Sequence, residues 1–205
     1  MEEYIIENLI DAEIGKKLKE YLTEKRYDHT IGVCKTALRL SGIYGGDREK
    51  LLMASLLHDV ARDLSIEEMR EIIKTGGRYE HISPIVVNNP LLLHGYAGRV
   101  IAENIFGVKD LEVLNAIEIH TTGSINMSLV DKIVFVSDYI EPGRTFRGVK
   151  RARELADRDL DRAVLYIIKE TLKRLIMKGE YILPCSFELY NHWVITERMM
   201  GENGR

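Results

Sequence analysis

The stretch Leu56-Leu57-His58-Asp59-Val60-Ala61-Arg62-Asp63 places two side chains that can bind metals at the end of an apolar helical turn. A polar group that is buried without a partner costs about 1–3 kcal/mol, so His58 and Asp59 require hydrogen bonds or a ligand.

Four more residues of the same chemical types lie at or near the ends of separate expected helices: His29, His94, His120 and Asp138. Each is separated from the next by about one helical hairpin, the spacing with which a helix bundle gathers distant side chains at one end. A single histidine near a helix end is more often a cap or a hydrogen-bonded surface residue. We interpret His81 and His192 in that way, whereas the ordered set of six predicts a shared site.

The chemistry of the six side chains indicates which metals they suit. Imidazole and carboxylate ligands together favour iron, manganese or zinc, and the absence of thiolates argues against a structural zinc. Four histidines and two aspartates are too many for one metal that keeps an open coordination position. Two metals bridged by one carboxylate would use all six ligands, so the set predicts a dinuclear metal site.

The composition limits the fold and the partners. With 205 residues and a mass of 23.5 kDa, the chain is expected to form a single domain over 1–205, with a short flexible tail from about residue 200. A net charge of −3 argues against a nucleic-acid partner. No apolar run reaches the roughly 18–20 residues that cross a bilayer, and the acidic start Met1-Glu2-Glu3 is unlike a secretory signal. The two cysteines, Cys34 and Cys185, suit a reducing cytoplasm.

Most of the chain has helical periodicity, which predicts an all-α fold. Asp47, Ser65, Asp110 and Ser128 are expected to start four of the helices, because Asp and Ser side chains accept hydrogen bonds from a first helical turn. The β-branched stretch 133–136 fits a strand as well as a helix, and residues 78–90 are expected to form a loop. The expected helices cover 13–24, 26–43, 47–57, 65–76, 91–105, 110–123, 129–140, 149–178 and 187–199.

The ordered set of six ligands resembles the signature of the HD-domain superfamily of metal-dependent phosphohydrolases. Four phrases around the ligands closely resemble the bacterial YqeK group, whose members are symmetric diadenosine tetraphosphate hydrolases. These phrases are Arg26-Tyr27-Asp28-His29-Thr30, Leu57-His58-Asp59-Val60-Ala61-Arg62, His120-Thr121-Thr122-Gly123 and Ser137-Asp138-Tyr139-Ile140-Glu141-Pro142-Gly143-Arg144. The resemblance covers roughly residues 15–195. Arg62 stands where lysine is commoner in the group, which keeps the charge but changes how it binds phosphate.

The resemblance implies an all-α HD-domain bundle with two metal ions. It implies that His29, His58, Asp59 and Asp138 hold one ion, and that His94, His120 and a bridging Asp59 hold the other. Iron is the implied metal, with manganese or another transition metal as alternatives. A hydroxide between the ions would attack a phosphorus of the polyphosphate, and symmetric cleavage of diadenosine tetraphosphate would give two ADP. A homodimer is also expected from the family.

Cationic side chains near the ligands are predicted to bind the substrate phosphates. Arg144 closely follows the Asp138 segment, and Arg62 follows the His-Asp pair by one helical turn. The segment 143–153 carries several more cations and no acid, and Arg147 and Lys150 are its further predicted phosphate contacts. The alternative for this segment as a whole is a solvent-exposed basic helix start.

Two hydroxyls and one further acid complete the predicted site. Thr121 and Thr122 are expected to donate hydrogen bonds to phosphate, with a helix C-terminal turn as the alternative. The predicted catalytic residues are Asp59, Arg62 and Asp63. Asp63 would assist proton transfer or orient a ligand, and a surface cap is its alternative role.

Three other functions remain open from the sequence. The first is another phosphohydrolase on the same metal site: a nucleotidase, a deoxynucleoside triphosphohydrolase or an alarmone hydrolase. The second is a mixed-valent di-iron oxygenase, against which the cations around Arg144 argue. The third is a metal-stabilised binding module without activity, which the intact ligand set disfavours.

Overall fold

The computed structural model describes residues 13–202, and every regular element within that range is a helix. This confirms the all-α fold class, and the ambiguous stretch 133–136 is helical. The elements are α2 (Glu13–Leu18), α3 (Glu24–Tyr44), α4 (Arg48–Leu57), α5 (Ile66–Thr75), η1 (Tyr79–His81), α6 (Pro84–Val87), α7 (Pro90–Asn104), α8 (Leu111–Ile119), α9 (Leu129–Ile140), α10 (Val149–Ala156), α11 (Leu160–Lys178) and α12 (Pro184–Glu202).

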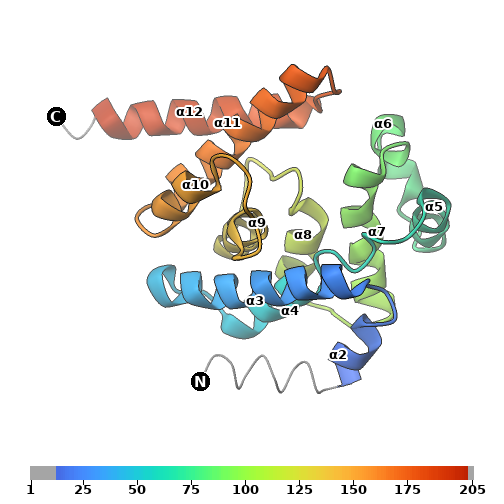
Figure 1. Cartoon of the computed structure of the whole chain (residues 1–205). Coiled ribbons are helices and arrows are strands. Elements are labelled where there is room, and N and C mark those ends of the chain that lie inside the picture. Colours follow the sequence, from blue (N-terminus) through green and yellow to red (C-terminus); the bar gives the residue numbers. More distant parts are fainter. Residues whose placement is uncertain (1–12, 203–205) are drawn as a thin grey trace.

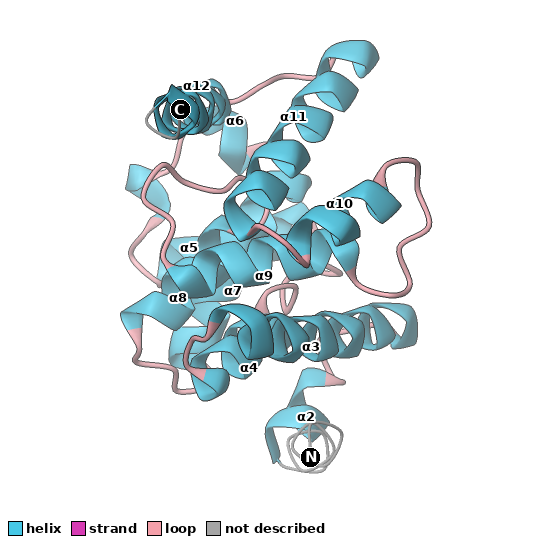
Figure 2. Ribbon diagram, turned by 90° about the vertical axis from the view of Figure 1, so that its left-hand side faces the viewer, coloured by secondary structure: helices cyan, strands magenta, loops and turns pink. Residues whose placement is uncertain are grey.

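Helix α9 lies at the centre of the bundle, between the α3–α4 pair and the α10–α11 pair (Figure 1, Figure 2). Helix α8 packs against α4, α7 and α9, while α5 and α6 pack against α7. Helix α12 contacts α11 on the outside of the bundle (Figure 1). This arrangement places α3, α4, α7, α8 and α9 around one interior.

The core consists of aliphatic side chains from these same helices. Leu38 of α3, Leu57 of α4, Leu114 of α8 and Ile133 of α9 are at most 1% exposed. Burying a side chain of this size stabilises the fold by roughly 1.5–3 kcal/mol. Because Leu57 directly precedes His58, core packing also fixes where that histidine lies.

All four predicted helix starts are confirmed. Asp47 and Asp110 each accept hydrogen bonds from two backbone N–H groups, at the starts of α4 and α8. Ser65 and Ser128 form capping boxes with the acidic residue three positions later, at the starts of α5 and α9. Each cap stabilises its helix by about 1 kcal/mol. The caps therefore help to fix α4, α8 and α9, from which most of the predicted metal ligands come.

Three expectations about the helices were wrong. The expected helix 13–24 ends at Leu18. The expected loop 78–90 contains η1 and α6, because Ser83 caps α6 and Pro84 takes its first position, where a missing N–H costs nothing. The long helix expected over 149–178 is two helices. Asp159 accepts a hydrogen bond from the backbone N–H of Arg162 and so starts α11 separately from α10.

The ends of the chain lie outside the described residues. The acidic start at 1–12 and residues 203–205 of the expected tail are among them, and α12 extends as far as Glu202. The single-domain assignment and the tail therefore stay predictions. Within 13–202, the structure contains no helix whose length and apolar character would let it cross a membrane.

Candidate metal centre

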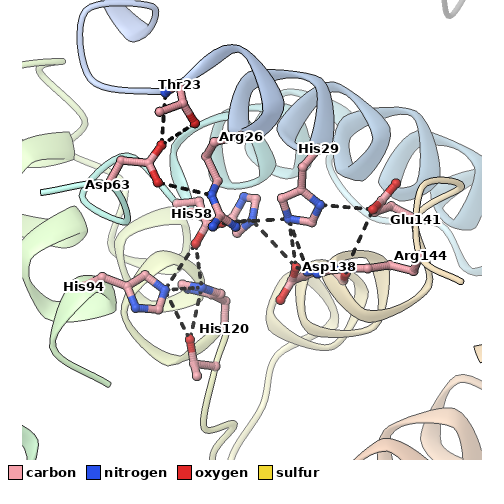
Figure 3. A network of polar contacts seen from close by, with 12 residues as sticks. Thr23, Arg26, His29, His58, Asp63, His94, His120, Asp138, Glu141 and Arg144 are labelled. Atoms are coloured by element: carbon pink, nitrogen blue, oxygen red, sulfur yellow. Dashed lines mark hydrogen bonds and ion pairs between the residues drawn. The ribbon is translucent and has the colours of Figure 1, made fainter. Parts of the chain in front are cut away.

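The structure brings all six predicted metal ligands together from five helices (Figure 3). His58 and His120 directly follow the last residues of α4 and α8, and Asp59 follows His58. His29 projects from α3, His94 from α7 and Asp138 from α9. His192 lies beside Trp193 on α12, outside this cluster.

Asp59 lies between two sets of imidazoles. Its Oδ1 atom is 3.2 Å from Nε2 of His94 and 3.6 Å from Nε2 of His120. Its Oδ2 atom is 3.7 Å from Nε2 of His58 and 3.8 Å from Nε2 of His29. The two oxygens of one carboxylate therefore face different sets, as a bridging ligand requires.

Backbone carbonyls orient three of the four imidazoles. The Nδ1–H groups of His58, His94 and His120 donate to the carbonyls of Ser55, Pro90 and Ile117, at 2.7, 3.3 and 2.8 Å. A carbonyl can only accept, so in the neutral ring each of these bonds leaves the Nε2 lone pair free to bind a metal. The tautomer suited to metal binding is thus set by the fold itself.

A carboxylate orients the fourth imidazole. Nδ1 of His29 lies 3.1 Å from Oε1 of Glu141, while its Nε2 lies 3.0 Å from Oδ1 of Asp138. Glu141 is only 5% exposed. A Cβ atom on Gly32 would lie 2.7 Å from Oε2 of Glu141, so glycine leaves room for this buried acid. Glu141 lies within the phrase around Asp138, but the sequence predicted no role for it.

Close approach of α7 and α8 brings two of the histidines together. Gly95 lies where these helices meet, and a Cβ atom there would overlap the carbonyl oxygen of Glu118. Glycine therefore lets the two backbones lie closer together than any larger residue would allow without movement. As a result, the Nε2 atoms of His94 and His120 lie 3.0 Å apart.

Two arginines neutralise the two aspartates. Nη1 of Arg26 lies 2.8 Å from Oδ2 of Asp59, and Nη2 of Arg144 lies 2.7 Å from Oδ1 of Asp138. Arg144 was predicted to lie near the site, whereas Arg26 was missed. A signal for Arg26 was present, because it precedes His29 by three residues and such pairs share one face of a helix.

Burial and charge act in opposite directions on these groups. Complete burial lowers the pKa of His58 to about 4, which leaves its imidazole neutral at pH 7. Burial alone would raise the pKa of the Asp59 carboxyl, but the nearby imidazoles, led by His58, hold it well below its usual range. A neutral imidazole beside an ionised carboxylate is the state in which both can bind a metal.

The donor set fits metal ions. Three overlapping groups place their ligand atoms within 4.8 Å of one another: His29, His58 and Asp59; His58, His120 and Asp138; and Asp59, His94 and His120. The buried Nε2 atom of His58 has no hydrogen-bond partner in the described part of the chain. The Nε2 atoms of His94 and His120 face the same space, and a shared cation would relieve the repulsion between their lone pairs.

The cluster opens into a pocket with a volume of about 450 Å³. Four of the predicted substrate-binding residues line this pocket: Arg62, Thr121, Thr122 and Arg144. The hydroxyl of Thr121 lies 3.1 Å from Nε2 of His120. Arg147 and Lys150 are exposed and lie outside the pocket lining. Of the three phosphate contacts predicted in the basic segment, Arg144 therefore lies in the pocket, whereas Arg147 and Lys150 lie outside its lining.

Asp63 lies beside the cluster (Figure 3). Its Oδ2 atom accepts hydrogen bonds from the backbone N–H and the hydroxyl of Thr23, at 3.0 and 2.8 Å. Its Oδ1 atom is 3.7 Å from Nε of Arg26, and Arg26 in turn contacts Asp59. Asp63 does not line the pocket, so its connection to the ligands runs through Arg26.

Comparisons with known proteins identify the family. A family model described as the HD domain matches residues 26–143, more than half of the chain. The chain is 38% identical over 179 residues to a symmetrical bis(5'-nucleosyl)-tetraphosphatase from Bacillus subtilis, covering 87% of this chain and 94% of that protein. The protein of the same name from Halalkalibacterium halodurans is 39% identical over 189 residues, covering 90% and 98%.

A solved structure agrees with these sequence matches. The crystal structure of a protein from Clostridium acetobutylicum, described as a predicted HD superfamily hydrolase involved in NAD metabolism, superimposes with a TM-score of 0.82. It shares 43% sequence identity and covers 95% of this chain and 97% of that one. The chain therefore belongs to the HD domain family, in the same group as the symmetrical bis(5'-nucleosyl)-tetraphosphatases.

Proposed function

We propose that this chain hydrolyses diadenosine tetraphosphate symmetrically to two ADP, with two metal ions held by the six ligands. The observation that carries this proposal is the placement of Asp59, whose oxygens face two sets of imidazoles beside a cationic pocket. The names of the Bacillus and Halalkalibacterium relatives support the substrate. Iron is the proposed metal, and manganese or another transition metal would also suit these ligands.

The six ligands would be shared between the two proposed ions. His94 and His120 would hold one ion, while His29, His58 and Asp138 would hold the other, and Asp59 would bridge them. When bound, the ions would lower the pKa of a water molecule and neutralise charge at the attacked phosphorus. Glu141 and the three backbone carbonyls would keep the imidazoles in the tautomer that binds metal.

The cations in the pocket would bind and orient the phosphates. The Arg62 side chain makes no ion pair with any residue that the structure describes, and it lines the pocket. Arg144 is held by Asp138, so its guanidinium is already placed beside the ligands. The hydroxyls of Thr121 and Thr122 would donate to phosphate oxygens. Arg147 and Lys150 would contact only a substrate that extends past the pocket lining.

A product assay tests the proposal directly. The protein is purified without oxygen, its metals are measured, and it is incubated with diadenosine tetraphosphate. We expect close to two metals per chain, and ADP as the only nucleotide product. Inert dinucleotide, together with phosphate or tripolyphosphate released from a mononucleotide, would instead indicate another HD-type phosphohydrolase. Oxygen-dependent turnover would indicate an oxygenase.

Two further parts of the proposal concern the assembly and its location. A homodimer is proposed, and light scattering on the purified protein measures it. A reducing cytoplasm is the proposed location, because both cysteines are free, with Cys34 buried and Cys185 exposed.

A further inference from the structure

One face of α11 forms a wall of the pocket that no sequence pattern predicted. Ile167, Thr171, Arg174 and Lys178 all line the pocket, and their spacing of three and four residues places them on one stripe of the helix. Ile167 at the start of the stripe is buried, whereas Arg174 and Lys178 at its end are exposed. The stripe therefore changes from apolar to cationic toward solvent.

The two cations at the end of this stripe differ from a neighbour on the same helix. Lys173 lies outside the pocket lining and pairs with Glu170 at 2.6 Å. Arg174 and Lys178 make no ion pair with any residue that the structure describes. They are one helical turn apart, so roughly 6 Å along the axis separates two positive charges that face one cavity.

These cations lie further along α11, toward its exposed end, than the buried Ile167. Helix α11 contacts α9, which carries Asp138, and then runs outward from the bundle (Figure 1, Figure 2). Arg174 comes seven residues after the buried Ile167, about 10 Å further along the helix axis. The pocket thus has cations at two places: Arg26, Arg62 and Arg144 beside the ligands, and Arg174 with Lys178 toward solvent.

We infer that Arg174 and Lys178 bind the phosphates of the substrate half that departs as a nucleoside diphosphate; this rests on the proposed function. A long polyphosphate requires positive charge along its length, and a single cluster beside the metals serves only one part of it. The pair on α11 would therefore recognise the length of the polyphosphate. It would favour a dinucleoside tetraphosphate over a substrate whose phosphates reach only as far as the metal ligands.

The chemistry of symmetric cleavage gives this pair a second role. A water oxygen forms a bond to one of the two central phosphorus atoms, and the bond from that phosphorus to the central bridging oxygen breaks. The bridging oxygen leaves with the electron pair as part of the second ADP, and the protons of the water pass to solvent. The departing half gains negative charge, which Arg174 and Lys178 are placed to stabilise.

The double substitution Arg174→Gln with Lys178→Gln tests this assignment. Metal content and melting temperature should match wild type, because both side chains are exposed and unpaired. The loss of two charge-assisted contacts should raise KM for diadenosine tetraphosphate roughly tenfold or more. KM should also rise less steeply with salt than it does in wild type, because fewer charges bind the substrate.

Two further variants make the result specific. Lys173→Gln removes a neighbouring lysine that already has a partner, and it should leave KM unchanged. Arg174→Lys with Lys178→Arg keeps both charges, and should restore most of the affinity that the glutamine pair loses. A glutamine double variant with wild-type KM and salt dependence would overturn the inference, while ADP formation by both proteins would leave the proposed function standing. A wild-type protein that forms no ADP would overturn the proposed function itself.

Discussion

The ligand cluster and the α11 wall face the same pocket but are built in opposite ways. In the cluster, His58, His94 and His120 are buried, and each donates to a fixed backbone carbonyl. On the wall, Arg174 and Lys178 are exposed and have no ion-pair partner in the described chain. The comparison indicates that the fold alone orients the side chains of the cluster for metal binding. The charges on the wall, in contrast, are left unpaired and are available to the substrate.

The largest effect is expected from Asp59→Ala, which tests whether the ligand cluster binds the metals. If Asp59 bridges two ions, its removal takes a ligand from both, so metal content and activity should be lost together. The melting temperature should also fall, because metal binding contributes to folding stability. Metal analysis and a melting curve measure both effects. Full metal content in this variant would show that the bridging ligand has been assigned to the wrong carboxylate.

Gly95→Ala tests whether the cluster depends on backbone geometry as well as on its ligands. The new methyl group would overlap the carbonyl of Glu118 and push α7 away from α8. Overpacking of this kind costs roughly 1–3 kcal/mol. It should also separate His94 from His120 and reduce metal content, although no ligand has been changed.

Gly42→Ala is the matched control for Gly95→Ala. Gly42 also lies within a helix, but a Cβ atom there would have no neighbour within 4 Å. The same substitution should therefore stabilise the protein by roughly 0.5–1 kcal/mol and leave the metals in place. Similar metal loss in both variants would contradict the proposed role of the close approach.

Much of the fold could be predicted from sequence because its signals are local. Asp47 and Ser65 cap helices through hydrogen bonds to residues two or three positions away, and such pairs are visible in any sequence. Asp159 gave the same signal within a long helical pattern, where continued periodicity concealed it. The six predicted ligands could be selected because they keep a fixed order and because the phrases around them resemble a known group.

The residues that were missed act through tertiary contacts. Glu141 and His29 lie 3.1 Å apart but are far apart in the sequence, so no spacing rule connects them. Arg174 and Lys178 become pocket residues only because α11 packs against α9. Arg147 and Lys150 show the opposite case. They belong to a strongly basic segment, which predicted phosphate contacts, and yet both lie outside the pocket lining.

Arg144→Ala sharpens the comparison, because Arg144 combines one feature of each region. Its guanidinium is held by Asp138, and it also lines the pocket. We expect the metals to remain, since a cation does not bind them, and turnover to fall roughly tenfold to a hundredfold, as for the loss of one charge-assisted contact. Steady-state kinetics beside metal analysis measure this. Unchanged kinetics would remove Arg144 from the substrate site.

Asp63→Ala should have the smallest effect, and it decides between two roles for this carboxylate. Asp63 accepts two hydrogen bonds from Thr23, which precedes α3, and lies near Arg26. Because the carboxylate of Asp63 is partly exposed, its loss should cost about 1 kcal/mol in folding stability, or roughly 2–4 °C in melting temperature.

Thr23→Ala removes the same hydroxyl–carboxylate hydrogen bond by deleting its donor, so the double variant should melt close to the Asp63 variant. Both single variants should keep their metals, and turnover should stay within a few-fold of wild type. If Asp63→Ala instead keeps its metals and loses most of its turnover while Thr23→Ala does not, Asp63 takes part in proton transfer and its contacts with Thr23 and Arg26 are secondary.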